Sequence, residues 1–341
     1  MASFETRVVT TPSQLQEISS DWAALWDRCR NPTPFERPEW MLSWVEAFSP
    51  SHIATIEVRL EGVLVGLAPW LIYRRDQERV LAFMAGGVSD YLDVLIDQRY
   101  ENQVVTSIFE AATGIDGWSV LDLTDLPWTS ALHRTKLGRV SLSHDSCSAL
   151  RLPNTKQELL QVLSKRQRAN LRNARSRLER AGGGAFEIAT PDDVPEFLED
   201  LFRLHASRWS QSGQPGVLAD ASIQKFHRNA TRKLTDSGMF RMYRLRLEQR
   251  PVAVLCALLG RSRLCCYAQG FDPEFAFVSP GTQLMFFAME DALQSGLRKF
   301  DFLRGEESYK QHWRAESEQT FRIQVSRSQV KGEGPVQEIA A

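Results

Sequence analysis

A tyrosine and a lysine, Tyr309 and Lys310, stand directly after a short strand pattern in the segment FDFLRGEESYKQHW, which runs from Phe300 to Trp313. A phenol can return a proton to a departing thiolate, because phenols have an ordinary pKa of about 10 and thiols a somewhat lower one. An ammonium group can stabilise a developing oxyanion or neutralise a phosphate. A short helix that carries these two residues at the carboxyl end of a strand favours transfer of an acyl group from a phosphate-bearing carrier.

Each predicted catalytic residue also has a purely structural interpretation. Tyr309 could pack against Trp313, which lies four residues on along the same helical face. Lys310 could be an exposed surface lysine. Glu306 is the third predicted catalytic residue, since its carboxylate could take a proton from an acceptor amine. Carboxylates at the start of a helix also complement the helix dipole, so Glu306 could serve only in capping.

The donor is expected to bind where a Ser279–Pro280–Gly281 turn begins a helical pattern that runs to Ser295. Serine is a frequent N-cap and proline suits the first helical position, so the turn can be read as a helix start alone. The functional interpretation adds that the first amides of the helix point outward, toward a phosphate. The predicted donor-binding residues are Gln269, Ser279, Gly281, Thr282, Gln283 and Arg304.

Carboxylates and a phenol are the predicted ligands of the acceptor. Asp90, Tyr91 and Asp93 follow two glycines, where a strand is expected to begin, and could bind acceptor hydroxyl or amine groups. They could equally be ordinary turn residues. Asp301 alternates with two phenylalanines, so we expect it to face away from the core and toward the cleft.

A strongly basic helical pattern runs from Lys156 to Arg180, with eight basic residues against two acidic ones in a chain of formal net charge -1. A solvated basic face is the ordinary interpretation. The local excess also fits a polyanionic partner: carrier phosphates, a nucleotide-linked sugar, acidic lipid headgroups or tRNA. Arg168 and Arg172 of this helix are predicted to bind substrate.

Composition excludes several classes of protein. Basic and acidic residues number 41 and 42, so the chain as a whole is not a general nucleic-acid binder. The five cysteines form no CxxC pair and no metal-ligand spacing, and we expect them to be reduced packing residues in a cytoplasmic protein without a metal site. The amino terminus lacks the apolar core of a signal peptide, and the longest apolar run is about half of a bilayer span.

The elements that must position these residues follow one plan in both halves of the chain. Each half is expected to contain a hairpin, at Glu61–Gly62 and Glu248–Gln249, then further strands and a late helical crossover. We therefore predict an α/β (α+β) fold with mixed, mostly antiparallel sheets flanked by helices, present twice. The predicted domains are residues 1–150 and 151–328, followed by a disordered tail at 329–341. Other expected elements are strands at 63–73, 91–96 and 319–326, the last in the second domain, and one helix at 156–181.

This order of elements resembles the GCN5-related N-acetyltransferase (GNAT) fold, and two such units with a long basic helix between them resemble the Fem-type tandem acyltransferases. The nearest likeness is to the CelD-like acetyltransferase family, associated with bacterial cellulose or envelope polysaccharide synthesis. The segments that carry it are 90–93, 165–168, 280–281 and 300–313. The likeness implies tandem GNAT-like acyl-CoA N-acyltransferase domains, acetyl-CoA as the donor, Tyr309 as the general acid, and a sugar or polysaccharide precursor as the acceptor.

The chain departs from the family pattern in two places. The wider superfamily holds pyrophosphate with a glutamine or arginine followed by two spaced glycines, whereas residues 277–282 contain one glycine. The first half has no counterpart of Tyr309 after its equivalent strand, so we expect a degenerate first domain that binds substrate or carrier. Two other functions stay open: a Fem-like transferase that takes aminoacyl-tRNA, and an inactive module that binds a nucleotide-sugar or a synthase partner.

Overall fold

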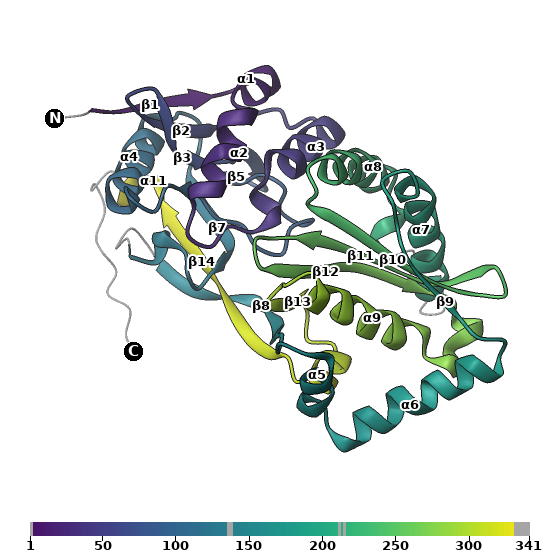
Figure 1. The fold of residues 1–341 in the computed structure, drawn as a ribbon. Coiled ribbons are helices and arrows are strands. Elements are labelled where there is room, and N and C mark those ends of the chain that lie inside the picture. The colour runs from purple at the N-terminus through teal and green to yellow at the C-terminus, as the bar shows by residue number, and fades with distance from the viewer. Residues whose placement is uncertain (1–2, 135–138, 211–212, 214–215, 331–341) are drawn as a thin grey trace. The chain divides into compact units, whose positions relative to one another are not determined.

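The computed structural model describes residues 3–134, 139–210, 213 and 216–330 (Figure 1). The chain divides into two units, one of Met1–Asp145 with Gln319–Ala341 and one of Ser146–Glu318. Each unit contains strands and helices, and the second holds all the predicted catalytic and donor-binding residues.

The first unit contains two sheets. One has the order β1 (Phe4–Val9), β2 (Thr55–Leu60), β3 (Val63–Ala68) and β6 (Leu95–Ile96). The other has the order β4 (Trp70–Arg75), β5 (Glu78–Phe83), β7 (Val120–Pro127) and β14 (Glu316–Ser326), the last from Gln319 onward. The helices are α1 (Pro12–Glu17), α2 (Ser19–Arg28), α3 (Pro38–Phe48), α4 (Glu101–Gly114) and the short α11 (Arg327–Val330).

The second unit is built on one sheet. Its strand order is β8 (Arg139–Arg151, in this unit from Ser146), β13 (Lys299–Arg304), β12 (Arg263–Phe271), β11 (Arg250–Leu259), β10 (Phe240–Leu247) and β9 (Ala185–Ile188). Its helices are α5 (Lys156–Val162), α6 (Lys165–Arg180), α7 (Val194–Ser210), α8 (Ala221–Asp236), α9 (Pro280–Gln294) and α10 (Ser308–His312). Helices α7 and α8 cover one face of the sheet, and α9 covers the other (Figure 1).

Both predicted hairpins are present and share one turn geometry. Glu61 and Gly62 have φ of 52° and 80°, and Glu248 and Gln249 have φ of 46° and 68°. Two consecutive residues with positive φ form the type I′ turn, whose twist matches that of the flanking strands. The second hairpin forms this turn without a glycine, so it carries backbone strain that the paired strands must offset.

Several predicted elements are interrupted. The strand expected at 63–73 is two strands in different sheets, because Pro69 lacks the amide that would continue the ladder. The helix expected at 156–181 is also two elements, α5 and α6, and Ser164 accepts a bond from the amide of Gln167 to cap the second. The strand expected at 91–96 is reduced to β6, and residues 90–94 lie outside regular structure.

The last strand lies in the first unit rather than in the second domain. Residues 320–326 of β14 pair with β7 of the first unit, whereas the sequence predicts this strand in the second. Alternation identifies a strand but does not specify its partner. Gln329, where the disordered tail is predicted to begin, lies in α11, and residues 331–341 of that tail lie outside the described residues.

The core of the second unit lies between its sheet and α9. Tyr243, Leu255 and Ala257 of the sheet pack with Met285 and Ala288 of the helix, and all are buried. All five cysteines are buried thiols outside any disulfide, as expected for packing residues.

Candidate active site

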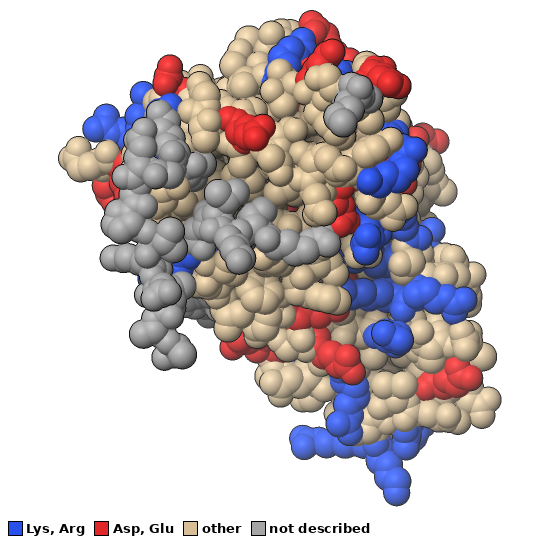
Figure 2. All heavy atoms as spheres, turned by 90° about the vertical axis from the view of Figure 1, so that its left-hand side faces the viewer, with Lys and Arg blue, Asp and Glu red and all other residues tan. Residues whose placement is uncertain are grey.

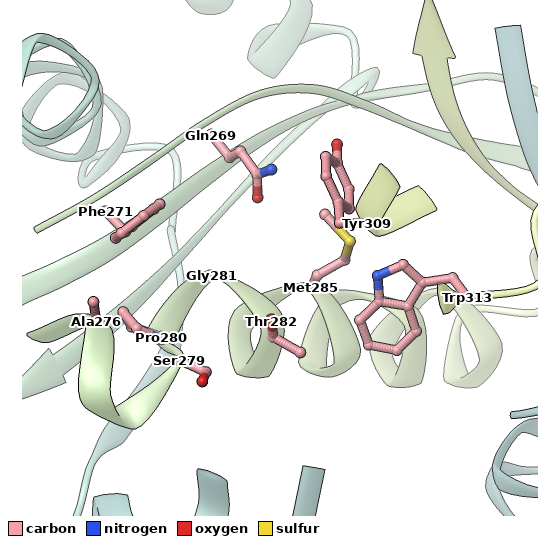
Figure 3. Close-up of a pocket in the computed structure, with 10 residues that line it drawn as sticks. All are labelled: Gln269, Phe271, Ala276, Ser279, Pro280, Gly281, Thr282, Met285, Tyr309 and Trp313. Carbon is pink, nitrogen blue, oxygen red and sulfur yellow. The ribbon is translucent and has the colours of Figure 1, made fainter. Parts of the chain in front are cut away.

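A pocket of about 280 Å³ lies within the second unit, at the start of α9. Figure 3 shows the ten side chains and backbone positions that line it: Gln269, Phe271, Ala276, Ser279, Pro280, Gly281, Thr282, Met285, Tyr309 and Trp313. Five of these, Gln269, Ser279, Gly281, Thr282 and Tyr309, are predicted site residues. The structure therefore brings together the helix tip at Gly281 and the phenol of Tyr309, which are 28 residues apart in the sequence.

The pocket exists because two parallel strands separate. Strands β12 and β13 pair in parallel over three residue pairs, from Arg263 with Lys299 to Cys265 with Asp301. Beyond them β12 continues to Phe271, with a bulge at Tyr267, and β13 continues to Arg304. Helix α9 begins at Pro280, nine residues after β12 ends at Phe271, and it is the crossover helix that joins the two parallel strands. Ligands of such sheets bind at the carboxyl ends of the strands, beside the helix start.

The first turn of α9 is open toward this pocket. Ser279 adopts a left-handed conformation, with φ of 50°, and its side chain does not cap the helix, contrary to the serine N-cap interpretation. The amide of Gln283 bonds to the carbonyl of Ser279 at 3.2 Å, so the amides of Gly281 and Thr282 precede the first bonded amide of the helix. These two amides and the positive end of the helix dipole can bind an anion.

Gln269 lies over the helix tip. A methyl group on Gly281 would stand 3.8 Å from both Gln269 Oε1 and Phe271 Cδ1. In Figure 3 the carboxamide of Gln269 is directed from β12 toward Gly281, and Tyr309 stands on the same side of α9. A carboxamide can both donate and accept hydrogen bonds, so Gln269 can bind amide groups of a ligand that enters between the strands.

Tyr309 belongs to α10 and is half-buried at the pocket wall. Its ring meets that of Phe302 edge to face, with centroids 6.5 Å apart. Trp313, one turn further along the chain, is buried and stacks on Phe286 at 6.3 Å. Met285, Phe271 and Trp313 complete an apolar lining that sequence analysis did not assign to the site. The spacing of Trp313 from Tyr309 was the one signal that could have identified it.

Lys310 is not available for catalysis. Its side chain is 3% exposed, and its ammonium donates to the carbonyls of Leu303, Arg304 and Gly305 at 3.0, 2.7 and 3.0 Å. It also forms an ion pair with Glu307 at 2.9 Å. These contacts use every proton of the ammonium group, so Lys310 holds the turn between β13 and α10 and thereby positions Tyr309.

Asp301 lies in the interior rather than facing a cleft. It is fully buried, and its carboxylate accepts a bond from the amide of Leu303 at 3.0 Å. Burial raises the pKa of this carboxyl, and the nearby Lys299 and Arg263, each 3.5 Å away, act in the opposite direction. Phe300, Asp301 and Phe302 are all buried, so both faces of β13 are covered here and alternation does not identify a side that faces a cleft.

Three further predicted residues do not line the pocket. Gln283 is buried, and its side-chain amide donates to the carbonyl of Val278 at 2.7 Å, so it holds the helix start from inside. Glu306 is exposed and Arg304 is half-buried, and both lie in the turn that Lys310 holds. Their predicted roles in proton removal and phosphate binding have no support from the geometry of the pocket.

Three of the predicted acceptor ligands, Asp90, Tyr91 and Asp93, lie in the first unit. Tyr91 is 2% exposed and packs near Phe35, so its phenol does not face a cleft. Asp90 is half-buried in the same irregular segment. Asp93 accepts bonds from the amide of Val94 and the hydroxyl of Ser130, each at 2.8 Å. Burial raises the pKa of Asp93 to about 7, although both hydrogen bonds oppose the rise.

A polar hollow of about 320 Å³ adjoins the pocket and shares Ser279 and Thr282 with it. Arg177 of α6 lies there and donates to the carbonyl of Phe277 and, at 3.4 Å, to the hydroxyl of Ser279. His312 of α10 lines the same hollow. Arg177 was not among the predicted site residues, because the sequence shows it only as one of many arginines on a basic helix.

Arg168 and Arg172, the other predicted substrate ligands, line a separate groove between α6 and α9. Arg168 donates to the carbonyls of Leu160 and Leu163, at 3.1 and 2.7 Å. It thereby supplies hydrogen-bond donors to carbonyl groups at the C-terminal end of α5. Arg172 is exposed.

No group of three or more His, Cys, Asp or Glu side chains within the described residues is arranged to hold a metal ion. Among the helices of the same residues, none combines the length and the apolar character needed to cross a bilayer.

Comparison with known proteins finds a family model that matches part of the second unit. Residues 165–311 match the acetyltransferase (GNAT) domain. The fold is similar to that of FemX, with a TM-score of 0.66 and 12% identity over 93% of this chain and 96% of that one. No curated protein matches the sequence.

Two other solved structures share the fold at 12% identity. One is the C-terminal domain of a candidate lysylphosphatidylglycerol synthetase from Agrobacterium fabrum, with a TM-score of 0.60 over 94% of this chain and 95% of that one. The other is a conserved protein of unknown function from Bacteroides thetaiotaomicron, with a TM-score of 0.58 over 95% and 99%. The predicted mixed α/β, GNAT-like fold is thereby confirmed. The match of residues 165–311 to this domain identifies the chain as an acyltransferase.

Proposed function

We propose that the chain transfers an acetyl group from acetyl-CoA to an amine or hydroxyl of a sugar or cell-envelope polysaccharide precursor. The observation that supports this proposal is the shared pocket of the α9 tip and Tyr309. The donor follows from the GNAT domain match, since such domains typically use acetyl-CoA. The acceptor class rests on the likeness to CelD-like acetyltransferases.

The residues present fit the donor. An acyl-CoA needs an anion site for its pyrophosphate and an apolar channel for its thioester arm. The amides of Gly281 and Thr282 supply the first, and Arg177 lies beside them. Phe271, Met285 and Trp313 line the second. A single glycine suffices at this turn, because Ser279 itself takes the left-handed conformation.

The chemistry is direct transfer without a covalent enzyme intermediate. When bound, the donor supplies an acyl group activated as a thioester. The acceptor nitrogen or oxygen forms a bond to the carbonyl carbon, the carbon–sulfur bond breaks, and the acceptor proton passes to solvent. A backbone amide of β12 polarises the carbonyl. Tyr309 gives its phenolic proton to the leaving sulfur and regains a proton from solvent.

The first unit is proposed to be catalytically degenerate and to contribute to substrate or carrier binding. Its strand β7 is the counterpart of β13, since each is the second strand of a parallel pair joined through a helix. The end of β7 and the residues just after it, 123–134, contain no tyrosine, whereas Tyr309 follows β13.

Release of free thiol from acetyl-CoA, measured with a panel of amino sugars, tests the proposal. Replacing Tyr309 by Phe removes one oxygen, so we expect kcat to fall by about 10²–10⁴-fold with little change in stability. Tyr73→Phe, at an exposed tyrosine of the first unit, is the matched control. Full activity of Tyr309→Phe would refute the general-acid role, and no thiol release with any acceptor would favour the inactive binding module.

A Fem-like transferase that takes aminoacyl-tRNA is the second candidate, and the basic surface of α6 favours it. Seven of the sixteen residues of α6 are basic and one is acidic. Binding of tRNA that weakens steeply with salt, together with aminoacyl transfer, would support this candidate over the acetyltransferase.

A further inference from the structure

A groove of about 580 Å³ lies between α6 and α9, and it is distinct from the pocket of Tyr309. The two hollows use different residues of α9: Phe286, Phe287 and Glu290 line the groove, whereas Thr282 and Met285 line the pocket. Its volume is within the range of about 300–1,000 Å³ found for small-molecule sites.

The floor of the groove is apolar. Four of its side chains are only half-buried although they are large and hydrophobic: Leu160, Phe186, Phe286 and Phe287. Leu171 of α6 completes this floor. Contact between water and an apolar surface costs free energy, so covering the floor would favour the binding of an apolar ligand.

The rim of the groove is cationic. Lys156, Arg168, Arg172 and Arg175 surround the floor, against one carboxylate, Glu290. Lys156 neutralises Glu290 through an ion pair, and Arg175 pairs with Glu179 at 3.2 Å. No described residue pairs with Arg172 through a hydrogen bond or an ion pair, so its guanidinium is free to bind an anion. In Figure 2 basic side chains gather at the lower end of the molecule, the level at which α6 lies in Figure 1.

The aromatic rings of the floor are arranged for an alkyl chain rather than for nucleic-acid bases. Phe286 stacks on Trp313 and has Lys156 5.9 Å from its ring centre. The ring of Phe186 lies 5.0 Å from that of Phe287 and has Arg175 at 5.4 Å. Bases bind single-strand proteins by stacking on free ring faces, whereas cationic side chains lie over Phe286 and Phe186 here.

We propose that this groove binds an anionic lipid, with its alkyl chain on the apolar floor and its phosphate headgroup at Arg172. The charge of the rim and the apolar floor together complement this class of ligand. The site goes beyond the acetyl transfer proposed above and does not depend on it.

Calorimetric titration of the full chain with hexyl, decyl and tetradecyl phosphate, each below its micelle concentration, tests the proposal. We expect affinity to rise by about fourfold for each methylene that the groove takes up. Arg172→Ala should weaken binding by about tenfold, because a charged hydrogen bond is lost. Leu160→Ser should lower the dependence on chain length.

Arg166→Ala is the matched control, since Arg166 is exposed on the same helix and does not line the groove. Equal weakening by both arginine variants would mean a diffuse attraction to the basic helix and would overturn the proposal. Affinity that is independent of chain length, or equal to that for inorganic phosphate, would overturn it too, as would binding of an RNA oligonucleotide in place of the amphiphile. Tyr309→Phe should bind the amphiphile normally, so the result is separate from that of the acetyl-transfer assay.

Discussion

Removal of the Lys310 ammonium should destabilise the second unit and thereby misplace Tyr309. In Lys310→Met a side chain of similar length loses three hydrogen bonds, to the carbonyls of Leu303, Arg304 and Gly305. A hydrogen bond to a charged group contributes about 1.5–3 kcal/mol, and carbonyls left without a donor add a desolvation cost. Relaxation of the turn and entry of water recover part of this sum. We therefore expect the free energy of unfolding to fall by about 3–5 kcal/mol.

Urea unfolding followed by circular dichroism measures this change, and thermal melting should show a fall of about 10 °C in Tm. Lys165→Met is the control, because Lys165 is exposed at the start of α6, and its substitution should change stability by less than about 0.5 kcal/mol. The activity of the folded fraction should fall without a change in the shape of its pH profile, since Tyr309 retains its phenol.

A loss of stability below about 1 kcal/mol would refute the structural role of Lys310. If such a stable variant also lost activity and showed an altered pH profile, Lys310 would be a catalytic residue after all.

Two further predictions concern the helix tip and the first unit. Gly281→Ala should leave stability unchanged or slightly raised, because its methyl group would meet no atom closer than 3.8 Å. The same methyl group would occupy the pocket, so acetyl-CoA binding should weaken on the order of tenfold. Unchanged affinity would mean that the donor does not approach this turn. Asp93 has a pKa raised to about 7, so its protonated form stabilises the fold, and this contribution is lost as pH rises from about 4 to about 7. In Asp93→Asn the urea midpoint should therefore decrease less between about pH 4 and about pH 7 than it does in the unsubstituted protein. An equal decrease in the two proteins would contradict the raised pKa of Asp93.

The sequence alone was sufficient to predict that Tyr309 and the start of α9 lie at one site. The helix start at Pro280, the strand at 299–304 and the short helix after it are all encoded locally, by turn residues and by periodicity. The rule that a crossover helix begins at the carboxyl end of its strand then places Gln269 and Gly281 together. Tyr309 lies 28 residues beyond Gly281 in the chain, and this separation did not obscure the pattern.

Three predicted site residues do not line the pocket, and they share one reason. Lys310, Asp301 and Gln283 are polar and were expected at a surface, but each is buried and bonded to backbone groups. A turn or a helix start without enough internal bonds must recruit side chains to satisfy its backbone. Periodicity cannot distinguish a polar residue that serves the backbone from one that serves a ligand.

The amino-acid sequence determined where helices and strands form, where the hairpins turn, and which residues lie at the start of α9, because these depend on contacts between near neighbours. Only the tertiary structure decided that β14 pairs with β7, that β12 and β13 separate to open a pocket, and that the apolar floor beside α6 stays half-exposed. These features depend on contacts between residues that are distant in the sequence. Burial of apolar surface in the complete fold selects those contacts.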